Sequence, residues 1–195
     1  LKNLQILITQ ALRLVSGGKE IKMSKRRGEF VSFEELVREV GSDASRFFML
    51  MVAPETHMDF DLKLAKERSL KNPVYYSQYA LVRAASILRK ISKKKIILKT
   101  PELARLLKNS EDIILMVKLA RFPEIIETAA KTYRVHELTR YAGELAAAFH
   151  NFYEKERVLG EEEMLAEARA ELVLATAIVL KTLFDILGIS APRKM

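Results

Sequence analysis

The chain of 195 residues carries 33 Lys and Arg against 25 Asp and Glu, a formal net charge of +8. The absence of cysteine excludes disulfides, thiolate metal sites and a thiol nucleophile, and it fits the reducing cytoplasm. The cationic excess favours an acidic partner such as nucleic acid, and no apolar run approaches the ~20 residues of a membrane span. The length suffices for one core, or for one domain and part of another.

The amino end predicts an amphipathic helix over residues 2–16. Its apolar residues recur at helical spacing, at Leu4, Leu7, Ile8, Ala11, Leu12 and Val15. Gly17 and Gly18 are expected to end this helix. The stretch has no initiating Met and does not resemble a signal peptide, so we interpret the chain as a fragment of a longer protein.

Residues 22–27, Lys-Met-Ser-Lys-Arg-Arg, place four cations and a hydroxyl between two predicted helices. Four charges cannot be buried without partners, so the segment is expected to be an exposed loop. Glycines on both sides would let such a loop close over a triphosphate and neutralise a departing pyrophosphate. A solvated basic surface loop is the alternative, because short basic motifs recur freely.

Two short helices are predicted after this loop. Ser32 and Glu35 have the spacing of a capping box, which opens the first helix. Gly41 is expected to end it, and Ser42 or Asp43 is expected to cap the second. The pair is apolar on one face and is interpreted as a connection between a catalytic core and the next segment of the chain.

A longer helical pattern begins at Asp59 and is interrupted at Asn72, which is expected to cap the next helix, with the following proline in its first turn. An aromatic stripe at helical spacing is typical of a core, and this interpretation is preferred for Tyr75 and Tyr76. For Tyr79, which shares a helix face with Arg83, binding of unpaired RNA bases is an equal alternative.

The strongest charge run comes next. Residues 83–108 hold nine Lys or Arg, among them Lys93, Lys94 and Lys95, against the single acid Glu102. Cations at a helix end are often only a cap favoured by the helix dipole, but eight net charges exceed that need. The run therefore predicts a surface that attracts phosphates.

The remaining sequence predicts further helices and no convincing strand. They are expected to open near residues 100, 110, 123 and 135 and after Gly160, with Gly188 as the last cap. We therefore predict an all-α fold, an antiparallel helical bundle over residues 59–195 preceded by the short remnant 1–58 of another domain. His57, His136 and His150 each stand alone and are assigned no catalytic role.

Three blocks of the sequence resemble one enzyme family. The segment KMSKRRGEFVSFEELVREVGSDASRFFML, which begins at Lys22, resembles the second ATP signature of class I aminoacyl-tRNA synthetases together with the segment after that signature. Two later blocks are similar to the arginyl-tRNA synthetase family in particular, DFDLKLAKERSLKNPVYYSQYALVRAASIL and FYEKERVLG with LKTLFDILGISAPRKM. KMSK alone is shared by several class I enzymes, but the three blocks in this order span nearly the whole chain.

The resemblance implies an enzyme that activates arginine with ATP and Mg²⁺ and esterifies the 3′ end of tRNA(Arg). Lys22 and Lys25 match the two lysines that close over the ATP phosphates and stabilise the departing pyrophosphate. Met23 and Ser24 fall on the middle positions of that ATP-binding signature. The other class I signature, an HIGH-like motif, does not occur in this sequence, so the chain alone is expected to be inactive. No protein-bound metal is implied.

By the same resemblance, residues 1–58 are the end of the catalytic domain and residues 59–195 an anticodon-binding domain. Tyr79, Tyr153 and the terminal Met195 match positions near the anticodon bases. Arg157 stands where some members have an aromatic side chain, and a guanidinium also stacks. With Arg83, Lys93, Lys94 and Lys95, these residues form the expected tRNA-binding set.

Two other function classes stay open. A stand-alone helical RNA-binding module would explain the basic run but not the KMSKR loop. A helical protein-interaction domain would need a strongly acidic partner. In each case we expect a cytoplasmic, monomeric protein without membrane contact.

Overall fold

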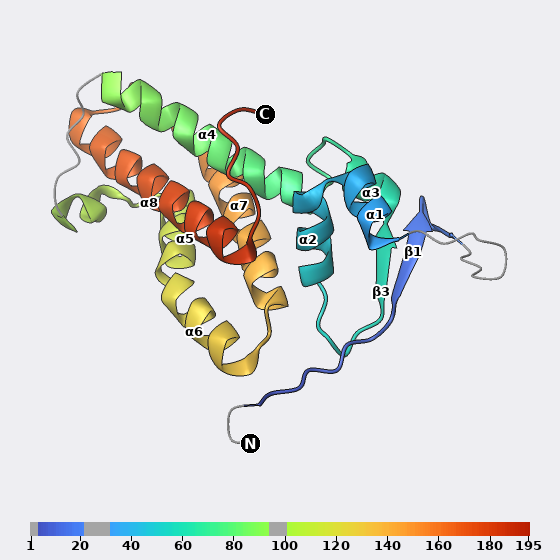
Figure 1. Ribbon diagram of the computed structural model, residues 1–195. Helices are drawn as coiled ribbons and strands as arrows, with labels where there is room; N and C mark the ends of the chain where they lie inside the picture. Colours follow the sequence, from blue (N-terminus) through green and yellow to red (C-terminus); the bar gives the residue numbers. More distant parts are fainter. Residues whose placement is uncertain (1–3, 22–31, 94–100) are drawn as a thin grey trace, which may run out of the picture.

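The computed structural model describes residues 4–21, 32–93 and 101–195 (Figure 1). The KMSKR loop, with Lys22, Met23, Ser24 and Lys25, lies outside the described residues, and so do Lys94 and Lys95. The helical bundle fills one end of the molecule and a small sheet with short helices fills the other, with a long helix reaching from one part to the other.

The small part contains a three-stranded sheet. Strand β1 (Leu12–Ser16) lies at its centre, antiparallel to β2 (Lys19–Glu20) and parallel to β3 (Met58–Asp61). Arg13 on β1 donates to both carboxylate oxygens of its register partner Asp59, at 2.7 and 2.6 Å, and this contact lowers the pKa of the Asp59 carboxyl.

This sheet corrects the expectation of a helix over residues 2–16 and of a chain without strands. Residues 4–11 form no regular element, and Leu14 of β1 is buried opposite Phe60 of β3. The apolar spacing fitted a helix, but Leu12, Arg13 and Leu14 also alternate as strand residues do. Parallel pairing with residues distant in sequence decides between the two, and local periodicity cannot reveal such a partner.

Two short helices come next, α1 (Phe33–Val40) and α2 (Ser42–Leu50). The predicted capping box is confirmed, because Ser32 Oγ accepts the Glu35 N–H at 3.1 Å and Glu35 Oε2 accepts the Ser32 N–H at 2.7 Å. The predicted side-chain cap of α2 is wrong. Gly41 is the N-cap, at φ 86°, and the carboxylate of Asp43 is engaged elsewhere.

The bundle is built from long helices joined by short connections. Its elements are α4 (Pro73–Lys93), the 3₁₀ helix η2 (Pro101–Leu106), α5 (Ser110–Ala120), α6 (Phe122–Thr132), α7 (His136–Lys155) and α8 (Glu163–Leu187). Helices α4, α7 and α8 pack on one another around fully buried side chains such as Phe149, Phe152 and Phe184. The prediction of an all-α antiparallel bundle is confirmed for this part, with the small sheet as an addition.

The short helix α3 (Leu62–Lys66) comes directly after β3 and packs on β1, α1 and α2. The predicted division between residues 58 and 59 therefore falls inside β3. That division stays a prediction, and the first residues assigned to the second domain lie in the sheet rather than in the bundle.

Candidate nucleic-acid interface

Two tyrosines and an arginine from separate helices meet on one side of the bundle. Arg83 of α4 donates from Nε to the hydroxyl of Tyr79 at 2.5 Å, and its guanidinium carbon lies 4.7 Å from the centroid of that ring. The same carbon lies 5.5 Å from the ring centroid of Tyr153 on α7. Tyr153 is 40% exposed, and the other two side chains are half-buried. We call these three residues the tyrosine–arginine strip; the guanidinium lies near both rings, and the strip still reaches solvent.

The start of α4 determines which way the strip faces. Asn72 is buried, and its Nδ2 donates to the carbonyls of Ala65 at 3.1 Å and Glu67 at 2.9 Å. Its Oδ1 accepts the N–H of Val74 at 3.1 Å, as an N-cap does. Because helical register continues from the first turn, this anchor directs Tyr79 toward α7.

The neighbouring tyrosines divide between the strip and the core. The ring of Tyr75 lies nearly parallel to that of Tyr79, with centroids 6.4 Å apart and 9° between the planes, so it extends the strip by one turn. Tyr76 packs against the hydrophobic core, and burial raises the pKa of its hydroxyl. The core interpretation fits Tyr76, whereas Tyr75 lies at the edge.

His150 of α7 lies against the tyrosines of α4. Its ring centroid is 4.6 Å from that of Tyr76 and 5.6 Å from that of Tyr79, and its Nε2 is 3.4 Å from the Tyr76 carbonyl oxygen. Burial lowers the pKa of the imidazole, while this carbonyl and Glu154 act in the opposite direction. The imidazole of His150 is therefore neutral, and it packs against the Tyr79 ring of the strip.

A hollow of 410 Å³ adjoins the strip. Arg83 and Lys90 of α4 line one wall, and Tyr153, Glu154 and Arg157 line the other. Lys90 and Arg157 are exposed, and neither forms an ion pair with a residue that the structure describes. Two such cations beside an exposed ring suit a nucleotide, because the ring can stack on its base and the cations attract its phosphate.

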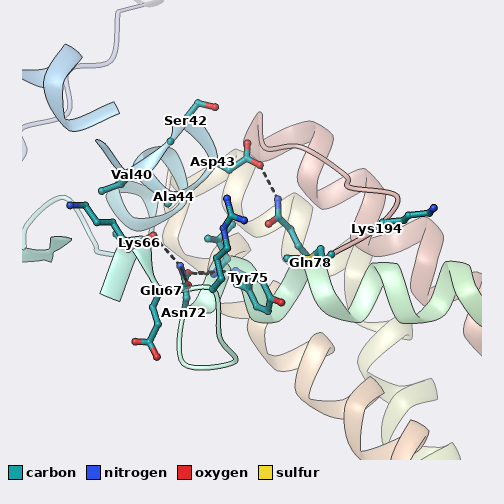
Figure 2. Close-up of a pocket in the computed structure, with 15 residues that line it drawn as sticks. Val40, Ser42, Asp43, Ala44, Lys66, Glu67, Asn72, Tyr75, Gln78 and Lys194 are labelled. Carbon is teal, nitrogen blue, oxygen red and sulfur yellow. Dashed lines mark hydrogen bonds between the residues drawn. The ribbon is translucent and has the colours of Figure 1, made fainter. Parts of the chain in front are cut away.

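The terminal Met195 lies apart from that hollow. It lines a second hollow of 480 Å³ with Tyr75, Gln78 and Lys194, between the start of α2 and the start of α4 (Figure 2). The carboxy-terminal tail runs back over α4 to reach it (Figure 1). Tyr75, Tyr79 and Tyr153, with Arg83 between the last two, form one row of aromatic side chains, and the two hollows lie at opposite ends of this aromatic row.

The structure thus brings together Tyr79, Arg83, Tyr153 and Arg157, and it places Met195 at the far end of the row, beside Tyr75. For Lys93, only the backbone at the end of α4 is described.

Gln78 and His150 were missed by the sequence analysis. Both are polar side chains turned inward on otherwise apolar helix faces, and their partners are distant in sequence. Local spacing therefore gave no signal for either residue.

Within the described ranges there is no cluster of three or more His, Cys, Asp or Glu placed to hold a metal ion. No helix among the described residues has the length and apolarity to cross a membrane.

Comparisons with known proteins converge on one family. The family described as DALR anticodon binding domain matches residues 77–195. Over 197 residues the chain is 46% identical to an arginine–tRNA ligase of Desulforamulus reducens, covering 99% of this chain and 35% of that protein. It is 42% identical to an arginine–tRNA ligase of Staphylococcus carnosus, again over 35% of that protein's length. The chain thus spans about a third of the curated relatives it matches.

Solved structures agree. An arginyl-tRNA synthetase structure from Campylobacter jejuni superposes on all of this chain with a TM-score of 0.86 and 29% identity, covering 42% of that chain. The arginyl-tRNA synthetase of Thermus thermophilus matches 93% of this chain with a TM-score of 0.69 and 29% identity, over 34% of its own length.

Proposed function

Because the chain belongs to the family of DALR anticodon binding domains, we propose that it recognises the anticodon loop of tRNA(Arg) as part of an arginine–tRNA ligase. The observation that carries this proposal is the convergence of Tyr79, Arg83 and Tyr153 on one partly exposed strip. Bases splayed from a loop would stack on these rings, at ~1–3 kcal/mol for each base. Lys90 would hold an adjacent phosphate, and the guanidinium of Arg157, which stands where some family members have an aromatic side chain, would stack on a further base.

The parent enzyme would charge tRNA(Arg) with arginine by cleaving ATP, which is bound together with Mg²⁺. Relatives that match 99% and 98% of this chain are named arginine–tRNA ligases, which supports this assignment. Lys22 and Lys25 would close over the ATP phosphates, with Met23 and Ser24 between them. The cysteine-free sequence suits the cytoplasm, where we place the enzyme.

The test compares two RNAs on the purified chain, a tRNA(Arg) anticodon stem-loop and a stem-loop with a scrambled anticodon. Tyr79→Ala, Tyr153→Ala and removal of Met195 should each lower the preference for the cognate loop, because each removes a contact to a base. Neutralising Lys93, Lys94 and Lys95 should weaken both RNAs alike and flatten the salt dependence, because phosphate contacts carry no sequence information.

A matched control is Tyr133→Asn. Tyr133 is a 47% exposed tyrosine outside the strip, and asparagine tolerates its left-handed backbone at φ 59°. This variant should keep the wild-type preference. Affinities at two salt concentrations, with circular dichroism to verify folding, decide the matter. Equal binding of cognate and scrambled loops by the wild-type chain would indicate a general RNA-binding module, and folded strip variants with wild-type preference would disprove the anticodon assignment.

A further inference from the structure

We propose that Arg169 of α8 is a positioning residue for RNA recognition, because it holds the α7–α8 connection that presents Arg157 and the wall of the hollow. This inference rests on the proposed function. Arg169 does not reach the hollow itself; its side chain is only 3% exposed and points into the bundle. It acts through the backbone of the residue that does.

One guanidinium serves three partners at this point. Its Nε and Nη2 donate to the two carboxylate oxygens of Asp112 on α5, at 3.1 and 3.3 Å, and Nη2 also bonds Glu156. The remaining nitrogen, Nη1, donates to the carbonyl oxygen of Arg157 at 2.9 Å. Asn109 then holds Glu156 from the outside, at 3.1 and 2.9 Å.

The held segment is the one that shapes the hollow. Helix α7 ends at Lys155, its C-cap residue Glu156 has an extended backbone at φ −109° and ψ 130°, and Arg157 projects to solvent directly after it. Val158 is buried again, and it lines the hollow with Leu159. The Arg157 carbonyl therefore lies between the exposed side chain of Arg157 and the buried side chain of Val158. At this point the hydrogen bond from Arg169 fixes the direction of the backbone.

Only an arginine has the shape for this arrangement. Asp112 is 1% exposed and needs a cationic partner, but a lysine would satisfy that charge with one ammonium group. A planar fork is needed to reach a carboxylate on one side and a backbone carbonyl on the other. Charge compensation and positioning are thus separable, and the experiment exploits this difference.

Two variants of the full chain separate the roles. Arg169→Lys keeps the cation beside Asp112 but loses the fork. Asp112→Val combined with Arg169→Met and Glu156→Gln replaces the whole buried ion cluster by uncharged side chains, which commonly preserves stability, and leaves the Arg157 carbonyl without its donor. The matched control is Thr176→Val on the same helix; it removes a buried hydroxyl that donates to the Leu172 carbonyl at 2.8 Å, away from the connection.

The first measurement does not depend on RNA. Trypsin cleaves after arginine and must capture the very carbonyl that Arg169 holds. The folded chain is digested under native conditions, and mass spectrometry monitors cleavage of the Arg157–Val158 bond. This cleavage should be slow in the wild type and in Thr176→Val, and faster in both Arg169 variants. Unchanged cleavage in a folded Arg169 variant would overturn the inference.

The second measurement is the preference for the cognate stem-loop over the scrambled one. In both Arg169 variants the ratio of the affinities for the cognate and scrambled stem-loops should fall about tenfold, as expected for the loss of one ordered base contact. Thr176→Val should keep the wild-type ratio. If the wild-type chain shows no preference, the proposed function fails. If the wild type shows it and the folded variants with an exposed Arg157 bond retain it, the positioning role alone is overturned.

Discussion

The carboxylate of Asp43, at the start of α2, accepts the backbone N–H of Ser190 at 3.0 Å, and the Ser190 hydroxyl donates to the same carboxylate. Gln78 of α4 joins them, because its Nε2 donates to Asp43 Oδ2 at 2.9 Å (Figure 2) and to the Ser190 carbonyl at 3.0 Å. This hydrogen-bonded group thus connects the carboxy-terminal tail with helices α2 and α4. A tail that carries Met195 to its hollow is thereby attached to the small part of the molecule as well as to the bundle.

We expect Asp43→Ala to lower the free energy of unfolding by about 2–3 kcal/mol, because the Ser190 N–H and the Gln78 amide lose a charged acceptor. Urea denaturation measures this change. The control is Asp185→Ala, which removes an exposed carboxylate paired with Lys181 at 2.9 Å and should cost less than about 0.5 kcal/mol. Equal losses in the two variants would show that the Asp43 contact carries no special stability.

Asn72→Ala should cost about 2–3 kcal/mol of unfolding free energy. It removes an N-cap and leaves the Ala65 and Glu67 carbonyls without their donor in a buried place. Ser32→Ala, which removes the exposed cap of α1, should cost about 1 kcal/mol. Urea denaturation again measures both losses. A larger loss in Ser32→Ala than in Asn72→Ala would contradict the anchoring role of Asn72.

The buried imidazole of His150 predicts a pH dependence of stability. Its pKa in the folded chain lies below the ordinary 6.5, so the unfolded chain binds a proton more readily than the folded chain does. Stability is therefore full above 6.5 and falls as the pH drops through that value toward the folded pKa. Thermal unfolding between pH 8 and about 5.5 measures the slope.

Two substitutions assign that slope to one residue. His150→Gln should flatten it, because the group that titrates is gone. His57→Gln removes an exposed histidine and should leave it in place. A slope that disappears with His57→Gln and persists with His150→Gln would contradict the assignment.

The chain alone should support no arginine-dependent ATP–pyrophosphate exchange, because its sequence contains no HIGH-like signature to hold the other side of the ATP. In a full-length ligase that contains this segment, Lys25→Ala should raise the activation barrier by about 2–4 kcal/mol with little change in the KM for arginine. Exchange by the purified chain, or a Lys25→Ala enzyme with unchanged kcat and a raised KM, would contradict these expectations.

Local chemistry explains which elements were predictable. Gly188 ends α8 in the left-handed conformation, at φ 66°, as its position after an apolar helical run indicates. Tyr79 and Arg83 share a helix face because they are four residues apart, and the capping box of Ser32 and Glu35 needs only neighbours in sequence.

The sequence by itself therefore determined the bundle helices, most of their ends and the candidate residues on each helix face, since these depend on spacing within a few residues. The tertiary structure alone decided that Leu12–Ser16 is a strand, because its parallel partner at Met58–Asp61 is distant in sequence. It also decided that Asp43 binds Ser190 instead of capping its own helix, and that Arg169 holds the carbonyl of Arg157. A polar side chain accepts whichever partner the packed chain brings within hydrogen-bond distance, and that choice is made by the folded core as a whole.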